Sequence, residues 1–237
     1  QISCRDKNRI AIQGDILGGA AMGVCNVLCL TGDGVQAGDH PQAKPVFDLD
    51  STSLLGIARG LRDEHRFESG RKITFAPRVL LGTAENPNVS PVEHRAVRLA
   101  KKIAAGAQFV QTQYCYDIPL LRRFMTAVED AGLLEQVFIL IGVGPIRTAK
   151  AGEWMRTHVP GIHIPDSVIE RMKGASDQTR EGLNLCVDLI QEVRTIKGVS
   201  GVHVMAYRQE ESVAEVIDRS GILAGRTPWF PGRDPQI

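Results

Sequence analysis

The sequence lacks an excess of charge of either sign, and it lacks long apolar runs. Its 237 residues include 28 Lys and Arg against 27 Asp and Glu, a formal net charge of +1. So small a net charge provides no general attraction to nucleic acid or to an anionic membrane surface. No apolar run approaches the roughly 20 residues that a membrane-spanning helix needs. We therefore expect neither a nucleic-acid partner nor a membrane partner.

Recognisable metal-binding and disulfide patterns are also missing. The cysteines form no CxxC pair and no zinc spacing; they are Cys4, Cys25, Cys29, Cys115 and Cys186. The histidines show no HxxxH or His-carboxylate spacing, so the sequence predicts no metal site. Most of the cysteines fall in predicted strands or helices. We therefore expect buried, reduced thiols, as in a cytoplasmic protein.

What the sequence does contain is a regular alternation of strand and helix signals. Short apolar runs that predict strands end near residues 4, 31, 84, 116, 143 and 207, with helix patterns between them. Continuous rather than alternating apolar runs are typical of a parallel sheet covered by helices. Polar residues stand at the carboxyl ends of four of these strands: Asp33, Asn86, Gln113 and Arg208. This placement is typical of an α/β barrel.

The expected fold is therefore α/β, a (β/α)8 TIM barrel. A length of 237 residues suits one such domain. Six of the eight strand-helix units of a barrel are visible, so we expect residues 1–237 to form a single barrel domain that lacks its first two units. A doubly wound sheet is the alternative, although no GxGxxG follows the first full strand.

Local signals indicate where several helices begin. Asp50 or Ser51 can cap one helix, and Asp117 another. Ser90 to Glu93 reads Ser-Pro-Val-Glu, which predicts a capping box with Ser90 as the N-cap. The chain ends in a stretch rich in Pro and Gly, Thr227–Ile237.

The stretch Asn26–Asp33 is the first candidate binding segment. Val27 to Thr31 predict a buried strand, and Gly32, which has no Cβ, lets a flat ligand approach the backbone. Asp33 then stands at the carboxyl end of the strand, where ligands bind in parallel α/β proteins. The loop that follows, residues 34–46, contains His40 and is longer than most connections. The alternative is an ordinary turn in which Asp33 caps the loop.

The second candidate segment is Gln111–Asp117, where amides and aromatics replace the expected Val and Ile. Strand alternation predicts Gln111, Gln113 and Cys115 on one face and Thr112, Tyr114 and Tyr116 on the other. An amide both donates and accepts, so it can recognise the edge of a heteroaromatic ring such as a pterin. A structural amide that bonds neighbouring backbone is the alternative.

Taken together, the segments resemble the methylenetetrahydrofolate reductase family. The resemblance rests on Leu-Thr-Gly-Asp (30–33), Pro-Asn-Val-Ser-Pro (87–91), the run 101–113, Gly-Pro-Ile (144–146) and the strand 201–208, in collinear order. It implies a (β/α)8 barrel with FAD at the carboxyl face of the strands. The implied reaction is reduction of methylenetetrahydrofolate to methyltetrahydrofolate, with NADH or NADPH as electron donor. The alternatives are the oxidative direction, or a flavin-free barrel subunit of a larger complex.

The resemblance also implies site residues. Those expected to bind FAD lie at strand ends, in the long loop and on one basic helix: Leu30, Thr31, Gly32, Asp33, His40, Phe47, Ala84, Asn86, Ser90, Arg98, Lys101 and Lys102. The folate would contact Gln113, Tyr114 and Arg208. Asp33 and Gln113 would be the catalytic residues, Asp33 by stabilising a cationic iminium and Gln113 by orienting the pterin.

Two further expectations accompany the resemblance. The acidic residue that the family carries on its first strand has no counterpart in these residues, and Glu85 is the first alternative acid to test. The protein is expected to be a cytoplasmic homo-oligomer that binds a folate substrate, with an electron-donating partner protein as an alternative to the nicotinamide.

Overall fold

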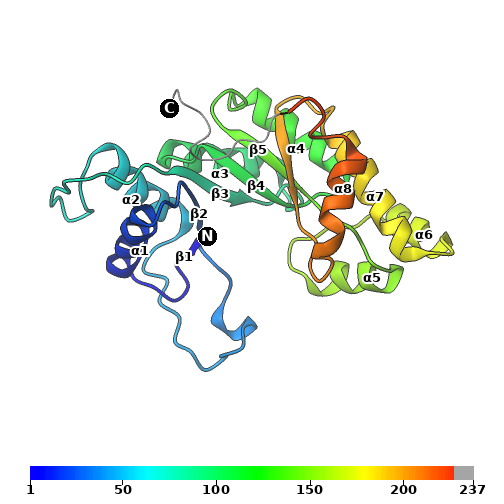
Figure 1. Cartoon of the computed structure of the whole chain (residues 1–237), viewed down its shortest axis with the longest axis horizontal. Coiled ribbons are helices and arrows are strands. Elements are labelled where there is room, and N and C mark those ends of the chain that lie inside the picture. The colour runs from blue at the N-terminus through cyan, green and yellow to red at the C-terminus, as the bar shows by residue number, and fades with distance from the viewer. Residues whose placement is uncertain (227–237) are drawn as a thin grey trace.

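The computed structural model describes residues 1–226 and contains one six-stranded parallel sheet (Figure 1). The strands are β1 (Ile2–Ser3), β2 (Asn26–Leu30), β3 (Leu80–Glu85), β4 (Phe109–Tyr114), β5 (Phe138–Val143) and β6 (Val199–Val204). They lie side by side in chain order, so each strand pairs with its sequence neighbours. In a doubly wound sheet, by contrast, the order of the strands reverses at a switch point. The predicted α/β barrel-type order is confirmed.

Helices alternate with the strands, as the sequence predicted. They are α1 (Arg9–Ala21), α2 (Ser51–Asp63), α3 (Val92–Ala105), α4 (Ile118–Asp130), α5 (Ala149–His158), α6 (Asp166–Gly174), α7 (Gln178–Val193) and α8 (Val213–Ser220). Two 3-10 turns, Val35–Ala37 and Glu210–Ser212, precede α2 and α8. The predicted tail Thr227–Ile237 lies outside the described residues.

The helices pack on one face of the sheet, and the hydrophobic core lies between the two layers. Strand residues such as Leu81, Val110 and Ile139 are buried there among helix side chains. Their sequence neighbours point the other way, to what we call the open face, where Leu80 is 36% and Phe138 61% exposed. In-register pairs place Ala84, Gln111 and Leu140 on this open face.

Two of the three helix starts follow the sequence prediction. Asp50 forms a capping box with Ser53, and the Asp117 carboxylate accepts a hydrogen bond from Leu120 N at 2.9 Å. The prediction for Ser90 is wrong. Pro91, with extended backbone, occupies the N-cap position of α3, so Ser90 lies one residue too early and makes no capping hydrogen bond.

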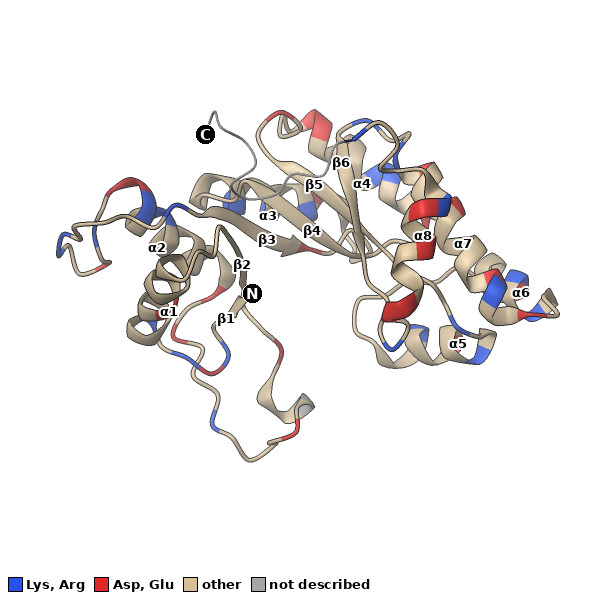
Figure 2. Cartoon of the chain, in the orientation of Figure 1, with Lys and Arg blue, Asp and Glu red and all other residues tan. Residues whose placement is uncertain are grey.

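Charged residues are mixed over the outer helices rather than gathered by sign. Figure 2 shows both basic (blue) and acidic (red) positions along α6 and α8. Several are paired across helices, such as Arg171 with Glu181 and Arg180 with Glu215. Within residues 1–226, no helix is both long and apolar enough to cross a bilayer.

Candidate functional site

The predicted site residues gather along the edge of the sheet where the parallel strands end. We call it the carboxyl edge. Because all six strands run the same way, the residues following β2, β3, β4 and β6 meet at this edge. Open strand ends are where ligands bind in parallel α/β proteins.

The end of β2 is built around Gly32. Gly32 has a φ of +89°, and a Cβ at this position would lie 2.1 Å from Ser3 Oγ on β1. The hydroxyl of Thr31 accepts a hydrogen bond from Ser51 N at 3.0 Å, which ties the strand end to α2. Leu30 is half-buried and Asp33 is exposed. Glycine at position 32 therefore lets the β2 end pack closely against Ser3 on β1, and Asp33 presents an exposed carboxylate beside it.

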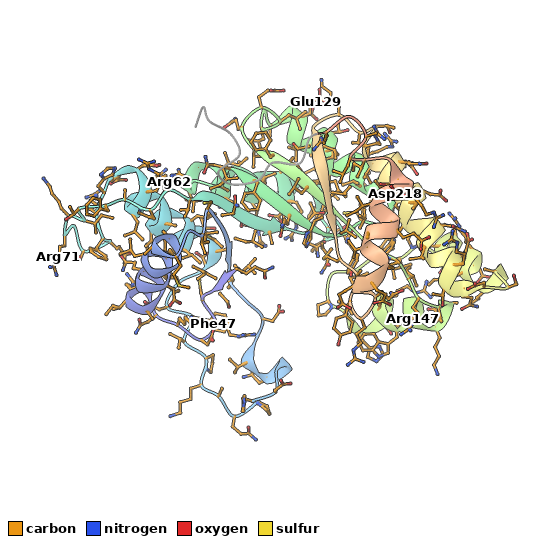
Figure 3. All side chains as sticks on the ribbon, in the orientation of Figure 1. Phe47, Arg62, Arg71, Glu129, Arg147 and Asp218 are labelled. Carbon is orange, nitrogen blue, oxygen red and sulfur yellow. The ribbon has the colours of Figure 1, made fainter. Side chains whose placement is uncertain are left out.

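Phe47 is held at the neighbouring end of β1. Its N–H donates to Cys4 O at 3.1 Å, and it adopts a φ of +42°, which is uncommon for an aromatic residue. Figure 3 labels Phe47 near α1 and β1. The Phe47 side chain is 39% exposed. The predicted aromatic therefore lies beside the β2 end, whereas His40 lies seven residues earlier in the sequence of the same loop and is exposed.

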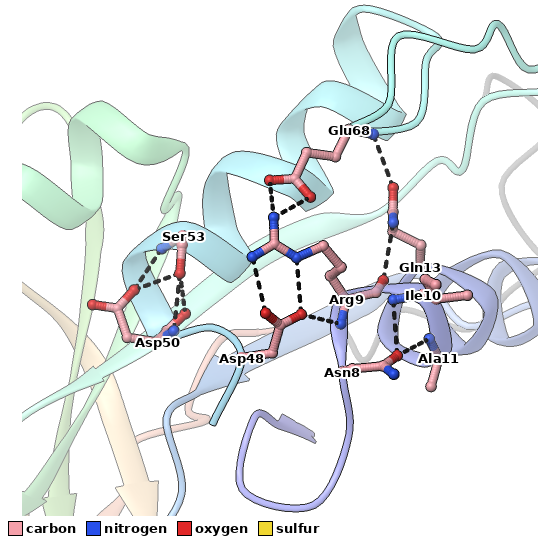
Figure 4. Close-up of polar contacts among 9 residues, drawn as sticks. All are labelled: Asn8, Arg9, Ile10, Ala11, Gln13, Asp48, Asp50, Ser53 and Glu68. Atoms are coloured by element: carbon pink, nitrogen blue, oxygen red, sulfur yellow. Dashed lines mark hydrogen bonds and ion pairs between the residues drawn. The ribbon is translucent and has the colours of Figure 1, made fainter. Parts of the chain in front are cut away.

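The residue after Phe47 anchors the loop (Figure 4). Arg9 donates to both carboxylate oxygens of Asp48, at 2.8 and 2.9 Å, and to both oxygens of Glu68 at 3.0 Å. The bidentate pair with Arg9 lowers the pKa of Asp48 to about 2. Such fork-to-fork pairing fixes orientation, so the backbone around Phe47 is fixed relative to α1.

At the end of β3, the predicted cofactor-binding residue Asn86 makes its side-chain hydrogen bonds within the protein. The side chain of Asn86 donates to Gly161 O at 2.9 Å and accepts from Asn88 N at 3.0 Å. Asn86 therefore organises its loop with both ends of its amide. Ala84 is half-buried on the open face, and Ser90 is exposed.

Lys102 and Glu85 form a buried ion pair on the helix-covered face. Lys102 Nζ lies 3.0 Å from Glu85 Oε2, and the two side chains are 7% and 2% exposed. The contacts of Lys102 are thus with the protein rather than with a surface ligand, and we do not retain it among the cofactor-binding residues. Glu85 does not face the open side of the sheet, so the expectation that it supplies an alternative acid is wrong. Arg98 and Lys101 lie on the exposed side of α3.

The end of β4 departs from simple alternation. Gln111 pairs with Leu140 but Tyr114 pairs with Gly142, so β4 carries one extra residue. This bulge brings Cys115 next to Thr112, with Sγ 3.4 Å from the Thr112 hydroxyl. The predicted grouping of Cys115 with Gln113 on one face is therefore wrong. An inserted residue shifts the side chains that follow it to the opposite face from the one that strict strand alternation predicts.

The two predicted folate contacts on β4 differ in availability. The Tyr114 hydroxyl donates to Met205 O at 2.9 Å, and burial raises the pKa of Tyr114 to about 12. Gln113 is half-exposed, and its Oε1 accepts from Tyr114 N at 3.0 Å. Because a backbone N–H can only donate, this contact identifies the amide oxygen and leaves the Nε2 hydrogens for another acceptor.

The end of β6 adds one predicted residue and one that the sequence reasoning missed. Arg208 is exposed, has a φ of +57°, and lies 5.2 Å from the ring centre of Tyr207. His203 pairs with Gly142 and shares the open face. Burial lowers the pKa of His203, which favours the neutral ring. The sequence could have indicated this position, because His203 lies two residues after Gly201 in the predicted strand and alternation places both on the same face.

The described residues contain no group of three or more His, Cys, Asp or Glu side chains arranged to hold a metal ion. All five cysteines are free thiols, and all but Cys25 are buried. Burial raises the pKa of Cys115 to about 12, so it is protonated and unreactive at neutral pH.

Comparison with known proteins gives a consistent result. A family model described as methylenetetrahydrofolate reductase matches residues 1–221. Methylenetetrahydrofolate reductase 2 of Schizosaccharomyces pombe is 24% identical over 243 residues, covering 95% of this chain and 36% of that protein. Methylenetetrahydrofolate reductase 1 of the same yeast is 25% identical over 210 residues, covering 85% of this chain and 32% of that protein. The chain thus spans about a third of the length of these relatives.

Among solved structures, the chain is similar to an uncharacterized protein from Clostridium thermocellum that binds two copies of 5-methyl-5,6,7,8-tetrahydrofolic acid. The TM-score is 0.50 at 16% sequence identity, and the match covers 92% of this chain and 91% of that one. A likeness at this level supports the fold.

Proposed function

The chain belongs to the methylenetetrahydrofolate reductase family, and on this premise we propose that it carries the catalytic site of an FAD-dependent oxidoreductase. The proposed reaction reduces methylenetetrahydrofolate to methyltetrahydrofolate, with NADH or NADPH as the electron donor. The observation that carries the proposal is the family match over residues 1–221, which includes every site residue at the carboxyl edge. The folate bound by the Clostridium thermocellum protein supports the substrate class.

The residues at the carboxyl edge fit a flavin. Gly32, whose missing side chain makes room for Ser3 on β1, keeps the β2 end free of a bulky side chain at this edge. Phe47 would cover the ring, and Leu30, Thr31 and Ala84 would line it. The family resemblance assigns the diphosphate to Arg98 and Lys101, which are exposed on α3, since guanidinium and ammonium groups are suited to it. When bound, FAD supplies hydride transfer between the nicotinamide and the folate.

The chain's own residues would hold the folate and balance charge. Gln113 would donate from Nε2 to the pterin and orient it. Asp33 would place a negative charge beside a substrate that becomes cationic when its methylene bridge opens. Arg208 would interact with the carboxylates of the folate tail. We further propose a cytoplasmic homo-oligomer, a location supported by the five free thiols.

Stopped-flow measurement of the two half-reactions tests the function. In the protein as it is naturally produced, NADH or NADPH should bleach the flavin and methylenetetrahydrofolate should restore its colour. Gln113→Ala should leave flavin reduction intact and slow the folate half-reaction by roughly 10- to 100-fold, because one oriented hydrogen bond is worth about 1–3 kcal/mol. Equal damage to both half-reactions would remove Gln113 from the folate site, and absence of a flavin spectrum would refute the proposal.

Asp33→Asn separates charge from shape. The variant should retain flavin, because the amide is isosteric with the carboxylate. Its flavin midpoint potential should rise, since a nearby negative charge that opposes reduction has gone. The folate half-reaction should slow more than flavin reduction. Spectroelectrochemical titration measures the potential, and Asp39→Asn, in the same exposed loop, is the control. An unchanged potential would mean that Asp33 is a turn residue.

A further inference from the structure

The irregularity in β4 is a well-defined β-bulge between two paired segments of the strand. Between the pairs Gln111–Leu140 and Tyr114–Gly142, two β4 residues, Thr112 and Gln113, lie opposite one β5 residue. Bulges are rare in parallel sheets, and where they occur beside active sites they redirect a side chain. Here the redirected segment contains Gln113, the residue proposed to bind the pterin.

The Thr112 hydroxyl takes the place of a backbone group at the bulge. Thr112 is only 3% exposed. Its Oγ1 accepts a hydrogen bond from Gly142 N at 2.8 Å and donates one to Gln113 O at 2.9 Å. In an ordinary parallel ladder, Gly142 N would donate to a β4 carbonyl instead. The hydroxyl therefore satisfies the donor that the bulge would otherwise leave unpaired.

The neighbouring residues leave little freedom for another arrangement. A Cβ on Gly142 would lie 2.4 Å from Thr112 O and 2.6 Å from Gln113 O, so these carbonyls crowd against the glycine. Beyond the bulge, Cys115 N donates to Gly142 O at 2.9 Å, and Cys115 Sγ donates to Gln113 O at 3.2 Å. The Gln113 carbonyl is thus held by two buried side chains, and Thr112 provides the shorter contact.

We propose that Thr112 is a positioning residue for Gln113. Its hydroxyl fixes the peptide plane between Gln113 and Tyr114, and the N–H of that same peptide holds Gln113 Oε1 at 3.0 Å. One buried hydroxyl therefore determines both where the Gln113 backbone lies and which end of its amide faces outward. This inference rests on the proposed function, in which Gln113 donates to the pterin.

Thr112→Val tests the inference, because valine keeps the shape and removes the hydroxyl. Gly142 N would lose its acceptor, and we expect the Kd for methyltetrahydrofolate, measured by calorimetry, and the folate KM each to rise about 10-fold. Flavin reduction by the nicotinamide should be unchanged. Thr112→Ser, which keeps the hydroxyl, should restore folate binding. If the valine variant does not fold, Thr112→Ala, which adds no methyl group next to Cys115, makes the same test.

Two controls distinguish positioning from general destabilisation. Thr83 is a fully buried threonine on β3 whose hydroxyl lies 3.5 Å from Cys29 O. Thr83→Val should lower stability without changing the folate Kd. In the Gln113→Ala background, Thr112→Val should have no further effect on folate binding, since its action passes through Gln113. Additive effects in the double variant would overturn the inference.

The outcomes also separate this inference from the proposed function. If the wild-type protein turns over folate and Thr112→Val binds it normally, the positioning role is wrong and the proposed function stands. If the wild-type protein neither binds nor reduces folate, both are wrong.

Discussion

Replacing Lys102 with methionine is expected to lower the free energy of unfolding by about 3–5 kcal/mol. The ammonium lies 3.0 Å from Glu85 Oε2 and 2.5 Å from Ala84 O, and both charged side chains are more than nine-tenths buried. Methionine fills the same space but leaves the Glu85 carboxylate buried without its cation. The cost of that unpaired charge, rather than the lost attraction, sets the size of the effect.

Urea denaturation of four proteins checks this expectation. Lys101→Met, at an exposed position on the same helix, should change stability by no more than about 0.5 kcal/mol. The double variant Lys102→Met with Glu85→Leu should recover most of the loss, because it removes both charges from the interior. A Lys102→Met protein as stable as the Lys101→Met control would show that Glu85 is not a buried charge.

Gly32→Ala is expected to abolish flavin retention while leaving most of the fold intact. Alanine at a φ of +89° costs about 1–2 kcal/mol of backbone strain. Its Cβ would also meet Ser3 Oγ at 2.1 Å. Moving that hydroxyl breaks its contacts with Arg5 N at 3.1 Å and Thr31 O at 3.4 Å. The β2 end that is proposed to contact the flavin would therefore be deformed.

Gly70→Ala is the matched control for this substitution. Gly70 has nearly the same φ, +86°, but a Cβ there meets nothing within 4 Å. In thermal denaturation Gly70→Ala should lose only the stability that the backbone strain costs, and Gly32→Ala should lose more because of the contact with Ser3. Only Gly32→Ala should lose the flavin absorbance near 450 nm after gel filtration. Adding Ser3→Gly to Gly32→Ala should restore part of the binding. Equal flavin content in the Gly32 and Gly70 variants would place the flavin elsewhere.

Much of the fold could be predicted because its signals are local. Apolar runs marked every strand from Val27 onward, and side chains such as Asp50 and Asp117 marked helix starts within a single turn. The order of the sheet followed from the alternation of strand and helix. The clustering of Gly32, Asn86, Gln113 and Arg208 followed in turn, since parallel strands share a carboxyl edge.

The rest depended on contacts between residues far apart in sequence. Lys102 and Glu85 are 17 residues apart and Arg9 and Asp48 are 39 apart, so a basic helix face gave no sign that one lysine points inward. The bulge at Thr112 could not be predicted from the alternation of side chains along the strand either, because that pattern assumes that each β4 residue lies opposite one β5 residue. What creates it is the match between a hydroxyl on β4 and a glycine on β5.

The strand order described above also bears on how the chain is made. One cluster of buried side chains draws its members from residues 4–107, and the other from residues 92–216. Within residues 1–226, every strand pairs only with the strand before or after it in sequence. As the ribosome releases the chain from its N-terminus, the first cluster can be completed while most of the second is still being translated. The core then forms in the same direction as synthesis, from the N-terminal to the C-terminal side. Few strand pairings depend on a segment that is translated much later.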